Sequence, residues 1–200
     1  MNHVFKKGDS KKPTIVLLHG TGGNEHDLLP IAEMIDPEAS VLGVRGNVLE
    51  NGMPRFFKRL AEGVFDEEDL KFRTKELYDY LDKASKEYGF DREKIIAVGY
   101  SNGANIAASL MYHYQDAFQG AILFHAMVPL KDITLPTLIN KHVFIGAGER
   151  DPIIPMDNTK HLIADLKQAG ATVEEFWTGG GHQLTREEVD AARHWYNQLT

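Results

Sequence analysis

Short apolar runs alternate along the chain with longer segments in which apolar residues recur at helical spacing. The apolar runs are rich in β-branched residues and are bounded by glycine, proline or polar clusters, which predicts strands. An unbroken apolar run is typical of a strand that is buried on both faces of a parallel sheet. The strands predicted in this way cover residues 3–6, at an edge, and then 14–18, 40–44, 95–98, 120–124, 142–145 and 173–177.

The segments between these runs predict five helices. They cover residues 27–35 and 66–88, the segment after Ser101, a segment that ends before Gly170, and the end of the chain from Thr185.

Capping signals support three of these helices. Acidic residues fill the first turn of the longest one, and Gly89 suits its stop. We expect Asp157 or Asn158 to cap the fourth helix, because short polar side chains accept hydrogen bonds from free helical amides. Thr185 and Glu188 have the spacing of a capping box at the start of the last helix.

This alternation predicts one α/β domain over residues 1–200, with a mostly parallel central sheet flanked by helices. No repeat or linker interrupts it. Residues 45–65 look irregular, because glycine and proline break any period there. Only the 16 residues 126–141 separate two late strands, which is too short for a large cap domain.

Composition and charge exclude several classes of partner and of catalytic site. The formal charge of −7 argues against nucleic acid as a partner and favours a small molecule. The chain contains no cysteine, which excludes disulfides, a thiolate nucleophile and a cysteine-ligated metal. No run reaches membrane-spanning length and no signal peptide is evident, so we expect a cytoplasmic protein without a membrane span. The oligomeric state stays open, a homodimer included.

The strongest chemical signal is the pentapeptide Gly99-Tyr100-Ser101-Asn102-Gly103, between a predicted strand and a predicted helix. In this context Gly-x-Ser-x-Gly indicates a nucleophile elbow, a turn so tight that both glycines are needed for steric reasons. The elbow exposes Ser101, and the first amides of the following helix point to where an oxyanion forms. An ordinary turn with an idle serine is the alternative.

A serine nucleophile needs an imidazole base. In folds with this elbow the base follows the acid, which follows the serine. Of the late histidines, His182 lies in a flexible glycine loop after the last strand, whereas His161 and His194 fall inside predicted helices. We therefore predict that His182 is the base.

The acid is expected on the loop after the strand at 142–145. Glu149, Asp151 and Asp157 are candidates there. Asp151 is preferred because Pro152 stiffens the loop beside it, and because Asp157 is better explained as a helix cap. Glu149 remains the alternative.

Two backbone amides are expected to form the oxyanion hole. One belongs to Asn102 and the other, we predict, to Thr21 in the glycine-rich loop after the strand at 14–18. Gly20 and Gly22 would let this backbone approach the substrate closely, although an ordinary glycine turn explains them as well.

Further substrate contacts are harder to assign. Arg45, Arg55 and Arg59 with Phe56 and Phe57 can wall a cleft for an aromatic or carboxylate group, and His125 and Met127 follow a strand at the same edge. The alternative is that these residues only stabilise the fold. The arginines would then pair with Glu62, Asp66 or Glu67, the phenylalanines would lie in the core, and His125 would be a buried packing residue.

Together these motifs resemble the phospholipase/carboxylesterase family of small α/β-hydrolases, related to acyl-protein thioesterases. The similarity is greatest to a bacterial branch of carboxylesterase-like hydrolases linked to quinone resistance. It rests on residues 17–24, Arg45-Gly46 with 52–57, 99–103, Gly148 through Asp151-Pro152, and Gly181-His182.

The resemblance implies an α/β-hydrolase fold with Ser101, Asp151 and His182 as nucleophile, acid and base. It also implies that Thr21 and Asn102 supply the oxyanion hole and that neither a cofactor nor a metal is needed. The chain departs from the eukaryotic thioesterases at Thr21-Gly22-Gly23 and Asn102, which argues against protein thioesterase activity.

The expected function is therefore that of a carboxylesterase, which cleaves small carboxylic esters through an acyl-enzyme. A catalytically idle hydrolase-fold protein that senses a ligand or binds a partner is the alternative.

Overall fold

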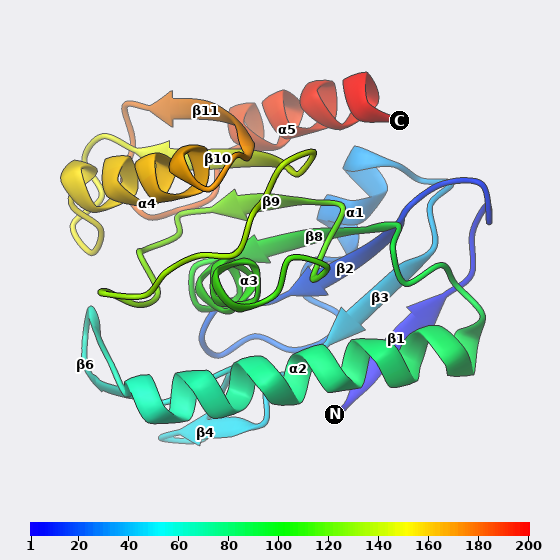
Figure 1. Cartoon of the computed structure of the whole chain (residues 1–200), viewed down its shortest axis with the longest axis horizontal. Coiled ribbons are helices and arrows are strands. Elements are labelled where there is room, and N and C mark those ends of the chain that lie inside the picture. Colours follow the sequence, from blue (N-terminus) through cyan, green and yellow to red (C-terminus); the bar gives the residue numbers. More distant parts are fainter.

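Seven strands form the central sheet of the computed structural model, which describes residues 1–200 (Figure 1). Their order across the sheet is β1-β3-β2-β8-β9-β10-β11, and all neighbours run parallel except β1 and β3. The strands are β1 (His3–Lys6), β2 (Thr14–Leu18), β3 (Val41–Val44), β8 (Ile95–Tyr100), β9 (Gly120–Phe124), β10 (His142–Gly148) and β11 (Thr172–Thr178). This confirms the predicted α/β fold with a mostly parallel sheet.

Alternation along the strands gives the domain two cores, one on each face of the sheet. In β2, Val16 and Leu18 join the larger core, whereas Ile15 and Leu17 join the smaller one. Successive side chains of a strand point to opposite faces, so an unbroken apolar run buries both.

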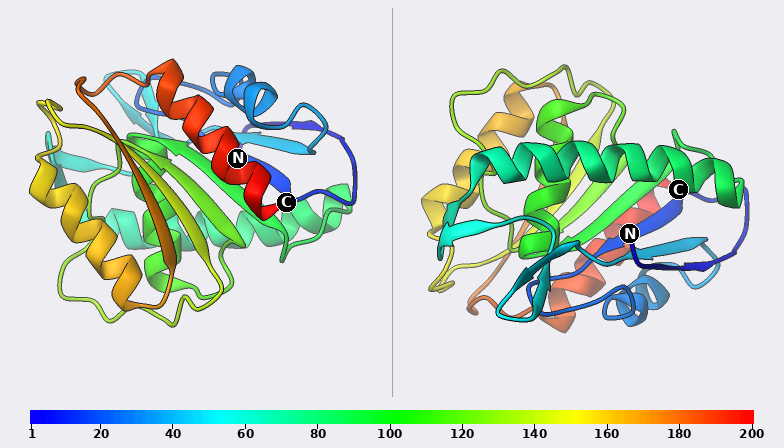
Figure 2. Two further views of the ribbon diagram at one scale, coloured as in Figure 1. Left: turned by 90° about the horizontal axis from the view of Figure 1, so that it is seen from above. Right: turned by 90° about the horizontal axis from the view of Figure 1, so that it is seen from below.

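Helices cover both faces: α5 lies in front of the sheet in the view from above, and α2 and α3 lie in front of it in the view from below (Figure 2). The larger core lies beneath α2, α3 and α4, and the smaller core lies beneath α1 and α5. The helices are α1 (Leu29–Ile35), α2 (Glu67–Tyr88), α3 (Asn102–His113), α4 (Met156–Gln168) and α5 (Arg186–Leu199). No helix is long and apolar enough to cross a membrane.

Two of the three predicted caps are confirmed. Gly89 ends α2 in the left-handed conformation, with φ at 72°. Thr185 and Glu188 form the capping box of α5. The predicted cap of α4 is wrong, because Pro155 precedes the helix and no side chain caps it; Asn158 instead accepts a hydrogen bond from the Val128 amide.

The segment expected to be irregular contains two β-hairpins at the carboxyl edge of the sheet (Figure 1). They pair β4 (Val48–Glu50) with β5 (Met53–Arg55), and β6 (Arg59–Ala61) with β7 (Val64–Phe65). The first hairpin turns through Asn51 and Gly52, both with positive φ, as in a type I′ turn. Residues 126–141 hold neither helix nor strand, so the domain has no helical cap.

Candidate active site

Four chemically active side chains meet at the carboxyl edge of the sheet, each within four residues of the end of a different strand. Ser101 follows β8, His125 follows β9, Asp151 lies after β10, and His182 lies after β11. The carboxyl ends of neighbouring parallel strands meet at one edge, where α/β proteins build their sites.

The turn that carries Ser101 is strained and closely packed. Ser101 has a φ of 52°, which is uncommon for a residue other than glycine. A Cβ at Gly103 would lie 1.9 Å from the Leu18 carbonyl oxygen, and one at Gly99 would lie 2.7 Å from the Ala104 backbone. Both glycines of the elbow are therefore required because backbone occupies the space of any side chain.

Three side chains form one hydrogen-bonded chain. Nδ1 of His182 lies 2.7 Å from Oδ2 of Asp151, and its Nε2 lies 2.8 Å from Oγ of Ser101. An ionised carboxylate can only accept, so the Asp151 contact places the imidazole proton on Nδ1. Nε2 is then free to accept the hydroxyl proton of Ser101.

Asp151 is held on both of its oxygens. The amides of Ile153 and Ile154 donate to Oδ1 at 2.8 and 3.0 Å, while Oδ2 faces His182. Burial alone would raise the pKa of Asp151, but the hydrogen bonds from His182 and these amides outweigh it and lower the pKa. The carboxylate is thus ionised and fixed in direction.

The competing acids and histidines lie elsewhere. Glu149 is exposed, and Asp157 lies within the first turn of α4. His161 faces Asp165 on α4, and the exposed His194 contacts Gln198 on α5. The structure therefore brings none of these four residues to Ser101.

The loop after β2 lies beside the elbow. Asn102 is the first residue of α3, where an amide has no partner within the helix. The Thr21 amide donates to no backbone carbonyl, and its hydroxyl accepts a hydrogen bond from the Arg55 guanidinium. Gly22 has a φ of 83°, and its amide donates to Pro54, so the first hairpin supports this loop.

A buried histidine anchors the same loop. Nε2 of His19 accepts a hydrogen bond from the Gly46 amide, and Nδ1 donates to the Gly20 carbonyl. Burial lowers the pKa of His19, so its ring is neutral, as this donor and acceptor pattern requires. Tyr100 limits the space beside Gly20, where a Cβ would lie 2.9 Å from its ring.

A cavity of about 280 Å³ opens above Ser101. The second hairpin contributes much of its wall. The Arg55 guanidinium also lines the cavity, and its pKa is lowered to about 10 by burial and by the positive charge of Arg59. The lining residues are Thr21, Arg55, Arg59, Glu62, Gly63, Phe65, Tyr100, Ser101, Asn102, Asn105, Met127, Ile153, Ile154 and His182.

The further substrate contacts predicted from the sequence divide into two groups. Arg55 and Met127 line the cavity. Phe56 and His125 are buried out of its reach, at 2% and 1% exposure, because Phe56 packs in the larger core and His125 lies behind Asp151. Gly20 and Gly22 do not line the cavity but shape the turn around Thr21.

The expected partners of the arginines are corrected. Arg45, which directly follows β3, pairs with Glu25, and Arg59, on the second hairpin, pairs with Glu50 of the first. Phe57 is fully buried, as the structural alternative required.

Two residues near the site were not identified from the sequence. Tyr100 donates a hydrogen bond from its hydroxyl to the His182 carbonyl at 2.7 Å, which fixes the histidine loop. Glu188 is fully buried and faces His125. Its capping-box spacing was visible, but that spacing gave no sign of a second contact.

His125, Asp151 and His182 are also of the types that bind metal ions, and their donor atoms lie within 4.8 Å of one another. The two histidines, however, point at one oxygen of Asp151 at 3.1 and 2.7 Å. Because an ionised carboxylate can only accept, both Nδ1 atoms carry protons in this arrangement, and neither offers a lone pair to an ion.

Comparison with known proteins identifies relatives of the whole chain. The model of the dienelactone hydrolase family matches residues 2–198. The hydrolase MhqD of Bacillus subtilis (strain 168) is 56% identical over 99% of this chain and 98% of its own length. Acyl-protein thioesterase 1 of Cryptococcus neoformans is 26% identical over 70% of this chain and 67% of its own. The crystal structure of the Bacillus cereus carboxylesterase superposes with a TM-score of 0.99 at 60% identity, over 100% of this chain and 95% of that one.

Proposed function

Because the chain belongs to the dienelactone hydrolase family, as an α/β-hydrolase of the phospholipase/carboxylesterase type that hydrolyses carboxylic esters, we propose that it works through an acyl-enzyme on Ser101. The observation that carries the proposal is the unbroken chain of hydrogen bonds from Ser101 through His182 to Asp151.

Acylation begins when the Ser101 oxygen attacks the ester carbonyl. His182 accepts the hydroxyl proton on Nε2 and then gives it to the departing alcohol as the C–O bond breaks. Asp151 accepts from Nδ1 throughout, and so stabilises the imidazolium that forms. In the second half a water molecule attacks the acyl-enzyme in the same way, which releases the acid and restores Ser101.

The negative charge of each tetrahedral intermediate falls on the former carbonyl oxygen. The amides of Thr21 and Asn102 are the donors proposed for it, because both lie at the cavity wall and lack partners of their own. Removal of one such donor typically costs about 10²–10³-fold in kcat.

We predict a preference for short acyl chains. The cavity of about 280 Å³ is slightly smaller than most ligand sites, which span roughly 300–1,000 Å³, and no helical cap extends it. Methylenes beyond the cavity gain no burial in the transition state. With p-nitrophenyl esters, kcat/KM should peak between about two and six acyl carbons and then fall. If decanoate is a better substrate than butyrate, residues 45–65 build an acyl tunnel and the prediction is wrong.

A fluorophosphonate probe distinguishes this enzyme from the idle ligand-binding module. An activated serine attacks phosphorus and displaces fluoride, so peptide mapping should find the phosphonyl group on Ser101. A folded protein that hydrolyses no ester and takes no label would favour the module. The cytoplasmic location and the homodimer stay predictions.

A further inference from the structure

Directly behind Asp151 lies a histidine that takes part in no bond-making or proton-transfer step of the proposed ester cleavage. His125 follows β9, its side chain is fully buried, and its backbone has a φ of 55°. Its amide donates to the Gly146 carbonyl at 2.8 Å, which fixes the turn. A bulky residue in this conformation is rare and costs energy, so the ring is held here by its surroundings.

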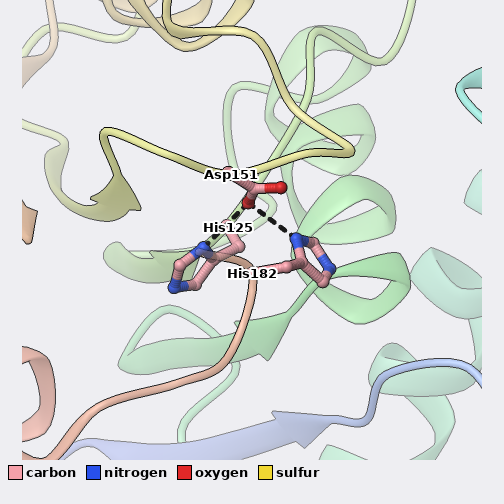
Figure 3. A group of neighbouring side chains, drawn as sticks. All are labelled: His125, Asp151 and His182. Atoms are coloured by element: carbon pink, nitrogen blue, oxygen red, sulfur yellow. Dashed lines mark hydrogen bonds and ion pairs between the residues drawn. The ribbon is translucent and has the colours of Figure 1, made fainter. Parts of the chain in front are cut away.

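The ring of His125 faces the acid of the proposed triad. Nδ1 lies 3.1 Å from Oδ2 of Asp151, the same oxygen that receives Nδ1 of His182 (Figure 3). An ionised carboxylate cannot donate, so His125 carries a proton on Nδ1. Asp151 thus accepts from a histidine on either side through a single oxygen.

The other ring nitrogen faces a second carboxylate. Nε2 of His125 lies 2.8 Å from Oε1 of Glu188, which is within ion-pair distance. The N–H bond does not point straight at the oxygen, so the contact is an ion pair without a well-aligned hydrogen bond. Neither atom has any other polar partner. Oε2 of Glu188 accepts from the amide and hydroxyl of Thr185 at 2.8 and 2.9 Å.

Charge balance requires a cation between these carboxylates. Glu188 is fully buried, and a buried carboxylate is very costly unless it is paired. Burial alone would lower the pKa of His125, but Glu188 and Asp151 outweigh it and raise the pKa.

The remaining polar neighbours of the ring cannot supply that cation. The rings of His182 and Tyr100 have centroids 5.3 and 6.0 Å away. Burial and the charges of Asp151 and Glu188 raise the pKa of Tyr100, so its hydroxyl stays neutral. His182 has to be neutral to act as a base.

We propose that His125 is a positioning residue of this site: clamped as an imidazolium between Glu188 and Asp151, it keeps the carboxylate of Asp151 ionised and aligned with His182. The inference deepens the proposed function and rests on it. With Oδ1 held by two amides and Oδ2 by two imidazoles, Asp151 has no freedom to rotate away when His182 takes the proton. Glu188 acts on catalysis only through His125.

The protonation state is measured by NMR of protein labelled with ¹⁵N in the histidine rings, with His125→Gln used for assignment. At neutral pH both ring nitrogens of His125 should carry protons in the wild type. In Glu188→Gln, which keeps the size of the side chain and an acceptor for Thr185, one of those protons should be lost. A neutral His125 in the wild type, or no change in Glu188→Gln, overturns the clamp.

Kinetics test the positioning role. Glu188→Gln and His125→Gln should each lower kcat by about 10–100-fold, as the loss of an orienting outer partner typically does, with KM changed by less than about threefold. The double variant should lose no more activity than His125→Gln alone, because Glu188 acts through His125. Unchanged kcat in the single variants, or losses that multiply in the double, overturns the proposal. If His125→Gln fails to fold, the proposal is tested with Glu188→Gln alone, from its kcat and from its histidine ring signals.

Tyr196→Phe is the matched control. Tyr196 lies on α5, as Glu188 does, but eight residues further along, and its hydroxyl donates a hydrogen bond to the buried carboxylate of Asp36. Loss of this bond should lower stability and leave kcat unchanged. The NMR signals are read in Ser101→Ala as well, where no turnover occurs. Failure of the proposed function would appear as esterase activity retained in Ser101→Ala, whereas failure of the clamp appears in the ring signals.

Discussion

Replacement of Ser101 with alanine is expected to lower kcat for ester hydrolysis by at least about 10⁴-fold, because every later step depends on the missing oxygen. The fold should survive. The change removes one hydrogen bond to His182, worth about 1 kcal/mol, which corresponds to a Tm shift of no more than roughly 4 °C for a chain of this size.

The measurement pairs initial rates on p-nitrophenyl acetate with thermal melts of both proteins. Activity within tenfold of the wild type would exclude Ser101 as the nucleophile. A large loss of Tm would leave the kinetic result without meaning, and Asp151→Asn, which keeps the shape of the acid, would then replace it.

Gly103→Ala should have the largest effect on stability. The added Cβ would lie 1.9 Å from the carbonyl oxygen of Leu18, which is a backbone atom of β2 and cannot turn aside as a side chain could. Relief requires α3 and β2 to move apart, so we expect a loss of at least about 3 kcal/mol in the free energy of unfolding. Chemical denaturation measures it.

Gly179→Ala is the matched control for this change. No atom lies within 4 Å of a Cβ at that position, and its φ is not positive, so its effect should stay within about 0.5 kcal/mol. Equal stability in the two variants would show that the elbow is not packed against β2 as described.

The sequence predicts the sheet and the meeting of Ser101, Asp151 and His182 because each of these residues lies within four residues of the end of its own strand. Once the strands are parallel, their carboxyl ends share an edge, and the order serine, acid, histidine leaves few choices. The elbow motif likewise predicts that Gly99 and Gly103 are needed for steric reasons, and the structure adds that the backbone of Leu18 occupies the space beside Gly103.

The rest depends on contacts that chain position does not encode. The first hairpin had a local signal, Asn51-Gly52, but its strands are only three residues long and show no period. The pairing of His125 with Glu188 spans 63 positions and joins a strand end to a helix cap, for which no spacing rule exists. A lone histidine after a strand gives no sign of whether it faces substrate or a buried carboxylate.

The most direct test is to capture the acyl-enzyme itself. The wild-type protein is mixed rapidly with p-nitrophenyl acetate, quenched with acid during turnover, and examined as intact protein and as peptides by mass spectrometry, with Ser101→Ala as the control. The account predicts a gain of one acetyl group, on the peptide that contains Ser101 and on that serine, and no such gain in the alanine variant. Steady hydrolysis with the acetyl group on another residue, or with no acetylated protein at any time point, would contradict it.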